Sequence, residues 1–416
     1  MIQNFEINSK QIDKIKNIST EEKDFRNKNL QIFKNSGFPS NRLEDWKFTD
    51  FRNIINNNFK ELDVLNIPET YNQINLIKDF EHNYILLVNG SLHSSSFDFE
   101  EKSKIKIGSY DKDTNYQLSN NPLICLNHAL ADGGFSLDIE DEYKFKKVLV
   151  IYNIFTKNIK NKILNNKNKI VVGKNSELHL IEYTVNESKS KFINNTYENI
   201  ILNENAKFRI LNLQSNKSEG FFHKFLNNKF SVNVDYSNFI FSSGLKFNKL
   251  DILCDLVGEK IKCNILAGLF LNEQEHQEIK TNINHLFPNC KSYQKIKNVL
   301  GSDSKGIFQG KIHVKDIAQK TDAYQLSKAL LLDGNAEFNS KPELEIYADD
   351  VKCSHGSTSG SIDENSLHYL MTRGLTREDS SKLVIKGFLN EIVDYIKSPS
   401  IKKFIESKLE DQINGY

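Results

Sequence analysis

The feature that most constrains this chain is a long central stretch in which short apolar runs are separated by polar clusters. From about residue 84 onward, runs rich in Ile, Val, Phe and Tyr alternate with clusters of Asn, Gly and Lys. Clear examples are residues 84–88, 148–154, 169–172, 178–185 and 208–213. Such runs are typical of β-strands, and helical periodicity is nearly absent from 145 to 360. The sequence therefore predicts a mainly β core.

A weak internal repeat is visible within this stretch. Each copy has a polar turn, a small residue, a polar residue, and then two apolar residues that flank another residue. Ser176, Ala206 and Ser237 take the small position in successive copies, and Ala336 begins a further copy. A period of about 30 residues is consistent with a solenoid of β-coils, in which each coil buries its apolar side chains against its neighbours. The pattern alone fits a β-sandwich equally well.

Both ends of the chain have helical patterns. A first helix should begin at Ser19, which is suited to be its N-cap, and end near Gly37. A second helical segment covers 41–59, where Trp46 is expected to be a packing anchor. Near the C-terminus, Thr376 resembles an N-cap, and a last helix has Pro399 at its first position.

Composition narrows the classes of protein. The chain has 416 residues, with 55 Lys and Arg against 54 Asp and Glu, so its net charge is +1. This balance argues against a large nonspecific attraction to nucleic acid or to an anionic membrane. No run of about 18 apolar residues predicts a transmembrane helix, and the first residues lack the pattern of a secretory signal. Five scattered cysteines without a Cys-x-x-Cys pair argue against a disulfide framework or a zinc ribbon. We therefore expect a cytoplasmic protein.

Nucleotide-binding and hydrolase motifs do not match. The glycine-rich stretches 301–306 and 306–312 lack the Lys and Ser or Thr of a phosphate-binding loop at the required spacing. The sequence also lacks G-x-S-x-G, H-E-x-x-H and G-x-G-x-x-G. We expect that this chain binds no ATP by itself.

The densest group of reactive residue types lies at 345–356. If this segment is extended, Cys353 and His355 point to the same face, with Asp349 behind them. A thiolate and an imidazole so placed can bind a soft metal or a cluster iron. They are about 6–7 Å apart along a strand, which is long for a nucleophile and its base. The plain alternative is that Cys353 is a buried residue beside a hydrogen-bonded His355. For His276 and His285 we also favour a structural role over a functional one.

The same residues resemble a known family. Residues 341–358 strongly resemble the SufB/SufD family of the Suf iron–sulfur cluster assembly system. The sequence Asp-Asp-Val-Lys-Cys-Ser-His-Gly at 349–356 favours the SufD branch over the SufB branch, although Ser357 replaces a frequent Ala. Further similar segments are 42–49, 276–295, 306–312, 318–323, 330–332 and 362–374.

The resemblance implies a fold and an assembly. The fold would be a right-handed parallel β-helix at 79–362, between an N-terminal helical domain at 1–78 and a C-terminal helical domain at 363–416. The chain would be a non-catalytic scaffold that pairs with SufB through the edge of the β-helix. Its C-terminal helices, which we place at 376–411, would dock the ABC-type ATPase SufC, so ATP hydrolysis would be supplied in trans. An isolated chain could also form a homodimer.

The resemblance also implies site residues. Cys353 and His355 would face SufB and be candidate ligands of a transient iron–sulfur cluster, whereas the main sulfur-accepting cysteine would belong to SufB. We expect His355 to be the main ligand, because we expect its strand to end at Gly356. Some complexes of the family associate with reduced flavin, but no flavin motif is visible here. Two alternatives remain open, a solitary β-helix enzyme that acts on polysaccharide through Asp349 and Asp350, and an adaptor in which Cys353 and His355 are inert.

Overall fold

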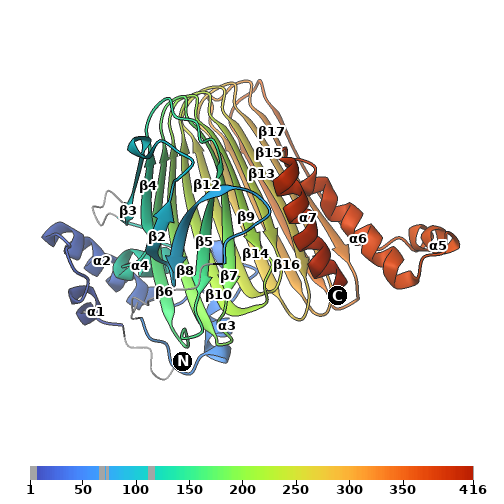
Figure 1. Cartoon of the computed structure of the whole chain (residues 1–416), viewed down its shortest axis with the longest axis horizontal. Helices are drawn as coiled ribbons and strands as arrows, with labels where there is room; N and C mark the ends of the chain where they lie inside the picture. Colours follow the sequence, from blue (N-terminus) through green and yellow to red (C-terminus); the bar gives the residue numbers. More distant parts are fainter. Residues whose placement is uncertain (1–6, 65–70, 72–74, 111–117, 416) are drawn as a thin grey trace.

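A computed structural model describes residues 7–64, 71, 75–110 and 118–415 (Figure 1). The helices are α1 (Ser9–Asp13), α2 (Thr20–Ser36), η1 (Glu44–Trp46), α3 (Phe51–Asn58), η2 (Lys102–Lys104), α4 (Pro122–Leu130), α5 (Glu364–Thr372), α6 (Arg377–Val393) and α7 (Pro399–Asn414). The first strands are β1 (His82–Val88), β2 (Ser91–Ser96), β3 (Ile105–Ser109), β4 (Phe135–Ile139), β5 (Val148–Phe155), β6 (Ile163–Val172), β7 (Glu177–Asn186), β8 (Phe192–Leu202) and β9 (Lys207–Gln214). The remaining strands are β10 (Ser218–Phe230), β11 (Asp235–Ser242), β12 (Leu245–Leu256), β13 (Lys262–Leu271), β14 (His276–His285), β15 (Lys291–Leu300), β16 (Lys305–Val314), β17 (Asp322–Leu331), β18 (Glu337–Ile346) and β19 (Lys352–Ser361).

The strands form a solenoid with two sheets. One sheet has the order β19-β17-β15-β13-β11-β9-β7-β5-β1-β2, and the other has the order β18-β16-β14-β12-β10-β8-β6-β4-β3. Each coil gives one strand to each sheet, and coils stack in parallel, whereas the pairs β1–β2 and β3–β4 are antiparallel. The predicted mainly β fold, with a parallel β-helix core of about eight turns between terminal helices, is therefore confirmed. The three domain ranges themselves stay a prediction.

Asparagines at one corner of the solenoid hold successive coils together. Asn175, Asn205 and Asn233 have left-handed backbone angles, with φ of 55°, 58° and 56°, which Asn adopts more readily than most residues. The amide of Asn205 donates to Asn175 at 2.7 Å, and that of Asn233 donates to Asn205 at 2.8 Å. This ladder of side chains fixes the corners in line, one above the next.

The register shows that part of the predicted repeat is wrong. Ser176 and Ala206 are equivalent, since Glu177 pairs with Lys207. However, Lys207 pairs with Asp235, so Val234 and not Ser237 takes the next small position. Ala336 precedes β18, which lies in the other sheet. Coils differ in length by a few residues at their corners, and a fixed period therefore loses the register.

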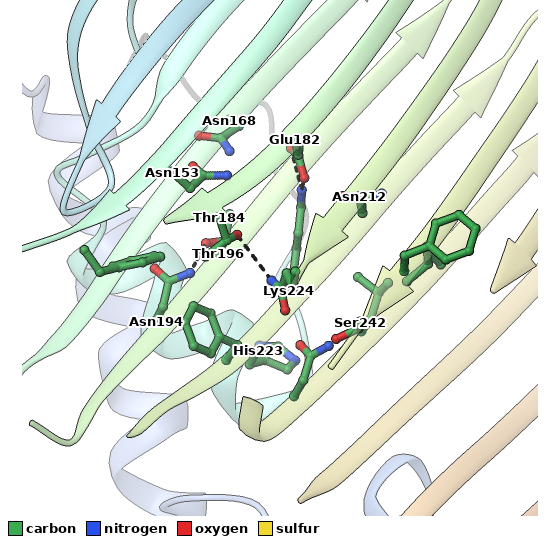
Figure 2. Close-up of a pocket in the computed structure, with 17 residues that line it drawn as sticks. Asn153, Asn168, Glu182, Thr184, Asn194, Thr196, Asn212, His223, Lys224 and Ser242 are labelled. Carbon is green, nitrogen blue, oxygen red and sulfur yellow. Dashed lines mark hydrogen bonds and ion pairs between the residues drawn. The ribbon is translucent and has the colours of Figure 1, made fainter. Parts of the chain in front are cut away.

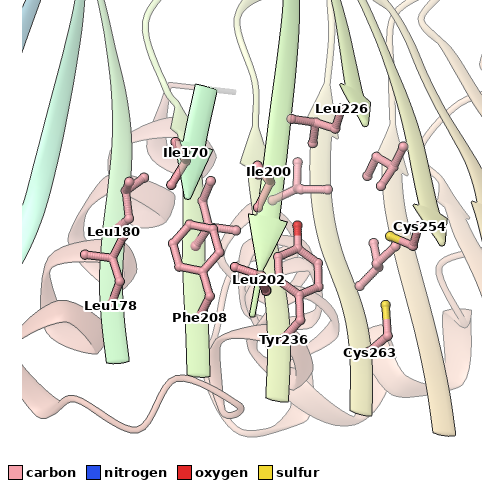
Figure 3. Close-up of a cluster of buried hydrophobic side chains, with 14 of the residues drawn as sticks. Ile170, Leu178, Leu180, Ile200, Leu202, Phe208, Leu226, Tyr236, Cys254 and Cys263 are labelled. Carbon is pink, nitrogen blue, oxygen red and sulfur yellow. The ribbon is translucent and has the colours of Figure 1, made fainter. Parts of the chain in front are cut away.

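The interior of the solenoid has an apolar part and a polar part. Apolar side chains from both sheets meet in one cluster, as Figure 3 shows for Ile170, Leu180, Ile200, Phe208 and Tyr236. Elsewhere in the interior, polar side chains line a cavity of about 70 Å³ (Figure 2). There Lys224 donates to Glu182 at 2.6 and 2.8 Å and lies 3.1 Å from Glu198. The ammonium group thus compensates two carboxylates within the fold.

The N-terminal helices cover the outer face of the nine-stranded sheet. Trp46 is fully buried against Phe51 and His223, which confirms its predicted role as a packing anchor. Ser19 caps α2, because its hydroxyl oxygen accepts a hydrogen bond from the backbone N–H of Glu22, also as predicted. The prediction of one helical segment at 41–59 is only partly right, because the chain forms η1, straightens, and restarts as α3 behind the N-cap Asp50.

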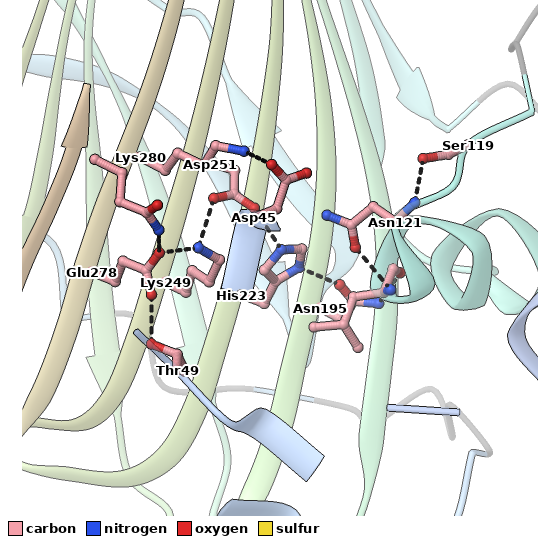
Figure 4. A network of polar contacts seen from close by, with 12 residues as sticks. Asp45, Thr49, Ser119, Asn121, Asn195, His223, Lys249, Asp251, Glu278 and Lys280 are labelled. Atoms are coloured by element: carbon pink, nitrogen blue, oxygen red, sulfur yellow. Dashed lines mark hydrogen bonds and ion pairs between the residues drawn. The ribbon is translucent and has the colours of Figure 1, made fainter. Parts of the chain in front are cut away.

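Charged residues fasten the segment around Trp46 to the sheet (Figure 4). Thr49 donates a hydrogen bond of 2.6 Å to Glu278 on β14, and Glu278 also pairs with the fully buried Lys249 on β12. Lys249 lies a further 3.1 Å from Asp251. Burial opposes the charge on Lys249, but Asp251 and Glu278 outweigh it and raise the pKa of this lysine. At the margin of this network, exposed Glu44 pairs with Lys341 on β18.

The C-terminal helices α6 and α7 cover the ten-stranded sheet (Figure 1). Thr376 caps α6 and Pro399 is the first residue of α7, as predicted. Phe404, Ile405 and Ile413 of α7 are buried in clusters that include strands of this sheet. The apolar stripe of the last helix is therefore used inside this chain.

We predict that Glu278→Ala strongly destabilises the protein, because the buried Lys249 would lose one of its two carboxylate partners and keep only Asp251. Breaking a buried ion pair on one side costs about 3–5 kcal/mol. Urea unfolding, followed by the fluorescence of Trp46, measures the free energy of unfolding. The control Glu44→Gln removes a fully exposed carboxylate of the same segment and should have a much smaller effect. Equal losses from both variants would contradict this explanation.

Candidate functional site

The two strands of the last coil lie at free edges of the solenoid. β18 pairs with β16 and β19 pairs with β17, and each is the terminal strand of its sheet. Most side chains of both strands are exposed or half-buried. A terminal strand offers backbone N–H and C=O groups that another chain can pair with. The last coil is thus suited to be an interface.

Cys353 and His355 lie on β19 and face the interior side of this coil. Cys353 pairs with Ala323, and His355 pairs with Gln325. Ala323 and Gln325 are both buried on β17. Cys353 is half-buried, whereas His355 is exposed and its side chain makes no hydrogen bond to the residues that the structure describes. The two side chains therefore share a face, and the ring of His355 is free to bind.

Two predictions about this segment are wrong. Residues 345–355 are not one strand, because β18 ends at Ile346 and β19 begins at Lys352. Asp349 and Asp350 form the bend at this corner of the coil and do not lie behind Cys353 on a strand. The strand also does not end at Gly356 but continues to Ser361. His355 is accessible because its strand is terminal, not because the strand stops.

Burial controls the state of the Cys353 thiol. It raises the pKa of Cys353 above its ordinary value of 9.0, and Asp322 acts in the same direction. The thiolate is the form that binds metals, so Cys353 must lose a proton before it can act as a ligand.

The other two histidines of the family resemblance lie at opposite ends of β14. His276 is hydrogen bonded to Thr49 at 2.9 Å, and His285 to Ser292 at 2.9 Å. Burial lowers the pKa of His276 to about 3 and that of His285 to about 4. Both rings are therefore neutral hydrogen-bonding groups, His285 fully buried and His276 half-buried, in agreement with the structural role we favoured.

Within the described parts of the chain, no three His, Cys, Asp or Glu side chains come together so that they could hold a metal ion. The polar cluster in the interior is not a metal site either, since the carboxylates of Glu182 and Glu198 already share the ammonium group of Lys224. Cys353 and His355 therefore stand at the edge as a pair, without a third such group beside them.

An exposed apolar surface lies on the C-terminal helices, which our sequence reasoning missed. α5 and the start of α6 extend away from the solenoid (Figure 1). The side chains exposed there are Tyr369, Met371, Leu375 and Leu383. In the sequence they look like an ordinary amphipathic stripe. Only the structure shows that no strand covers them.

The site is thus a Cys and a His on the open terminal coil of a parallel β-helix, and the comparison with known proteins identifies the family. The family described as "SUF system FeS cluster assembly, SufBD core domain" matches residues 154–388. The chain belongs to this family, and thus to proteins of iron–sulfur cluster assembly, as the resemblance predicted.

Three relatives show how far the similarity extends. "Iron-sulfur cluster assembly protein SufD" of Escherichia coli is 24% identical over 393 residues, which cover 93% of this chain and 92% of that protein. "Iron-sulfur cluster assembly SufBD family protein slr0076" of Synechocystis is 28% identical and "Protein ABCI7, chloroplastic" of Arabidopsis thaliana is 25% identical. These two matches cover 56% and 59% of this chain, and 53% and 51% of the relatives.

None of the helices in the described residues has the length and apolar character needed to cross a bilayer. The cytoplasmic location stays a prediction.

We predict that Cys353 is the one cysteine that reacts readily with Ellman's reagent in the native chain. Cys125, Cys254, Cys263 and Cys290 are fully buried, whereas Cys353 is half-buried. Because the pKa of Cys353 is raised, the reaction should be slow at pH 7 and should quicken as the pH rises through 9.

The matched control is Cys353→Ser, which should remove the readily reacting thiol while all the remaining cysteines react in guanidinium chloride. If a readily reacting thiol remains in the native Cys353→Ser variant, the accessible cysteine is not the one on the terminal coil.

Proposed function

We propose that the chain is the scaffold subunit of a SufB–SufC–SufD complex, in the SufD position. The last coil pairs with SufB, and His355, with Cys353 as a secondary ligand, binds the nascent iron–sulfur cluster at that junction. The observation that carries this proposal is the exposed, unbonded ring of His355 beside Cys353 on a terminal strand. Membership of a cluster assembly family supports it.

The chemistry of the two side chains favours His355 as the main ligand. A neutral imidazole offers a ring nitrogen to iron without losing a proton. Cys353 is the softer ligand once deprotonated, but its raised pKa opposes this step. With only these two groups on this side, the remaining ligands come from SufB. The site then exists when the subunits meet and is dismantled when they part, which lets the complex release its product.

The chain itself is a non-catalytic subunit in this proposal. SufC hydrolyses ATP, and its movement opens and closes the junction between SufB and this chain. We assign no residue of this chain to ATP or to reduced flavin. A solitary polysaccharide-cleaving enzyme is disfavoured, because the chain belongs to an assembly family and Asp349 and Asp350 lie in an exposed corner.

We place the SufC contact on α5 and the first half of α6. Our sequence analysis placed it at 376–411, a range that includes α7. Phe404, Ile405 and Ile413 of α7 are buried in this chain and leave α7 less apolar surface for a partner. Exposed apolar side chains, Met371 and Leu375 among them, gather on the projecting part. Exposed apolar patches of this kind mark interaction surfaces.

We predict that His355→Ala abolishes cluster maturation in cells while the complex with SufB and SufC still forms. The reason is that the ring would contribute a ligand, but it is exposed and makes no hydrogen bond within the described residues, so its loss should leave the fold intact. Cys353→Ala should have a milder effect. The measurements are the activity of an iron–sulfur enzyme in cells and co-purification of the three subunits. Normal maturation with His355→Ala, or loss of the complex, would refute the ligand role.

We predict that the double variant Met371→Asp, Leu375→Asp loses SufC in a pull-down and keeps SufB. A buried carboxylate in an apolar contact is strongly unfavourable. The matched control is Val232→Asp, because Val232 has the same exposed fraction as Met371, 41%, but lies at a corner of the solenoid. If the double variant binds SufC as the wild type does, the contact lies elsewhere.

A further inference from the structure

A buried glutamine lies directly beside His355. Gln325 on β17 is the register partner of His355 on β19, and both occupy inward positions. Neighbouring strands are about 4.8 Å apart, so side chains at paired inward positions can touch. The next inward pair on the same two strands proves this reach, since Ser327 donates a hydrogen bond of 3.0 Å to Ser357.

The amide oxygen of Gln325 has no hydrogen-bond partner within the described residues. The residue is only 1% exposed, and its Oε1 atom is one of the buried polar atoms without a partner. Its Nε2 atom donates a long bond of 3.4 Å to the backbone oxygen of Glu343. Leaving a buried acceptor unsatisfied costs about 1–3 kcal/mol. Other buried polar atoms share this status, Gln294 Nε2 among them, but Gln325 differs because its register neighbour on the open side is His355, whose ring N–H could serve as the donor.

The fold makes room for this amide. Gly310 on β16 faces Gln325 across the interior, and a Cβ atom at Gly310 would lie 2.3 Å from the amide oxygen of Gln325. Any side chain at this position would displace the glutamine. The amide thus lies in a space that depends on a glycine, one strand away from the free ring of His355.

We propose that Gln325 is a positioning residue for His355. When a partner covers the last coil, the amide oxygen of Gln325 accepts a hydrogen bond from one ring N–H of His355. This bond fixes the tautomer, so that the other ring nitrogen presents its lone pair to iron. Mutation of a group that orients a histidine ligand in this way usually lowers metal affinity or activity about 10- to 100-fold. The inference rests on the proposed function of His355.

The test uses the assembled SufB–SufC–SufD complex, with ¹⁵N-labelled histidine in this chain alone. Nitrogen chemical shifts of the ring report the tautomer, and the complex with His355→Ala identifies the signal. We expect one tautomer in the wild type. Gln325→Leu should give a mixture of both tautomers and lower the rate of cluster assembly by about tenfold or more. Gln325→Glu keeps an acceptor oxygen and should restore the single tautomer.

The matched control is Gln294→Leu. Gln294 is the register partner of Gln325 one coil further in, is equally buried, and also has an unpartnered amide atom, but it does not adjoin His355. This variant should leave the tautomer unchanged. The proposal is overturned if Gln325→Leu leaves both the tautomer of His355 and the rate of cluster assembly as in the wild type. It is also overturned if the variant lowers only the stability of the protein, which would mean that Gln325 has a purely structural role.

An equal change of tautomer in Gln294→Leu would also overturn it. Failure of the proposed function looks different from any of these results. In that case His355→Ala would support normal cluster assembly, whereas the tautomer of His355 would still respond to Gln325→Leu.

Discussion

In-register stacking of coils is the constraint on which the rest of this structure depends. Each strand of the parallel core satisfies its backbone groups with the strands before and after it, so every inward residue lies over its equivalent in the next coil. Corner asparagines such as Asn205 reinforce that register with their own ladder. A stack of this kind must end somewhere. Its last strands, β18 and β19, carry a free edge that the same backbone chemistry makes able to bind another chain.

The helices restrict where a partner can bind. The N-terminal helices cover one sheet with a mixed apolar and charged contact around Trp46, and α6 and α7 cover the other sheet with a largely apolar one. Both broad faces are therefore occupied in part by the chain itself. Among the described residues, the terminal coil and the projecting α5 are left uncovered by these helices (Figure 1).

Sequence reasoning found the elements whose signals are local. The strand texture, the N-caps Ser19 and Thr376, and the buried Trp46 depend on short-range patterns, and all were predicted correctly. Sequence reasoning failed where tertiary contacts determine the conformation or the packing of a segment. The corner after Ile346 breaks an apparently continuous extended segment, and nothing in the stripe of α7 tells whether it packs against a strand or a partner.

The inward or outward direction of a polar residue was also beyond the sequence, and it matters most at the candidate site. Glu182 and Lys224 face inward and compensate each other's charge within the fold. Gln325 faces inward too, yet its oxygen is left without a partner, and its neighbour in the ladder is the free ring of His355. In a stacked fold, the backbone groups of an inner coil are satisfied by the next coil, whereas the outer edge of the last coil can be completed only by another molecule. Buried polar atoms without a partner also occur in inner coils, Gln294 among them, so what distinguishes Gln325 is its place beside that open edge.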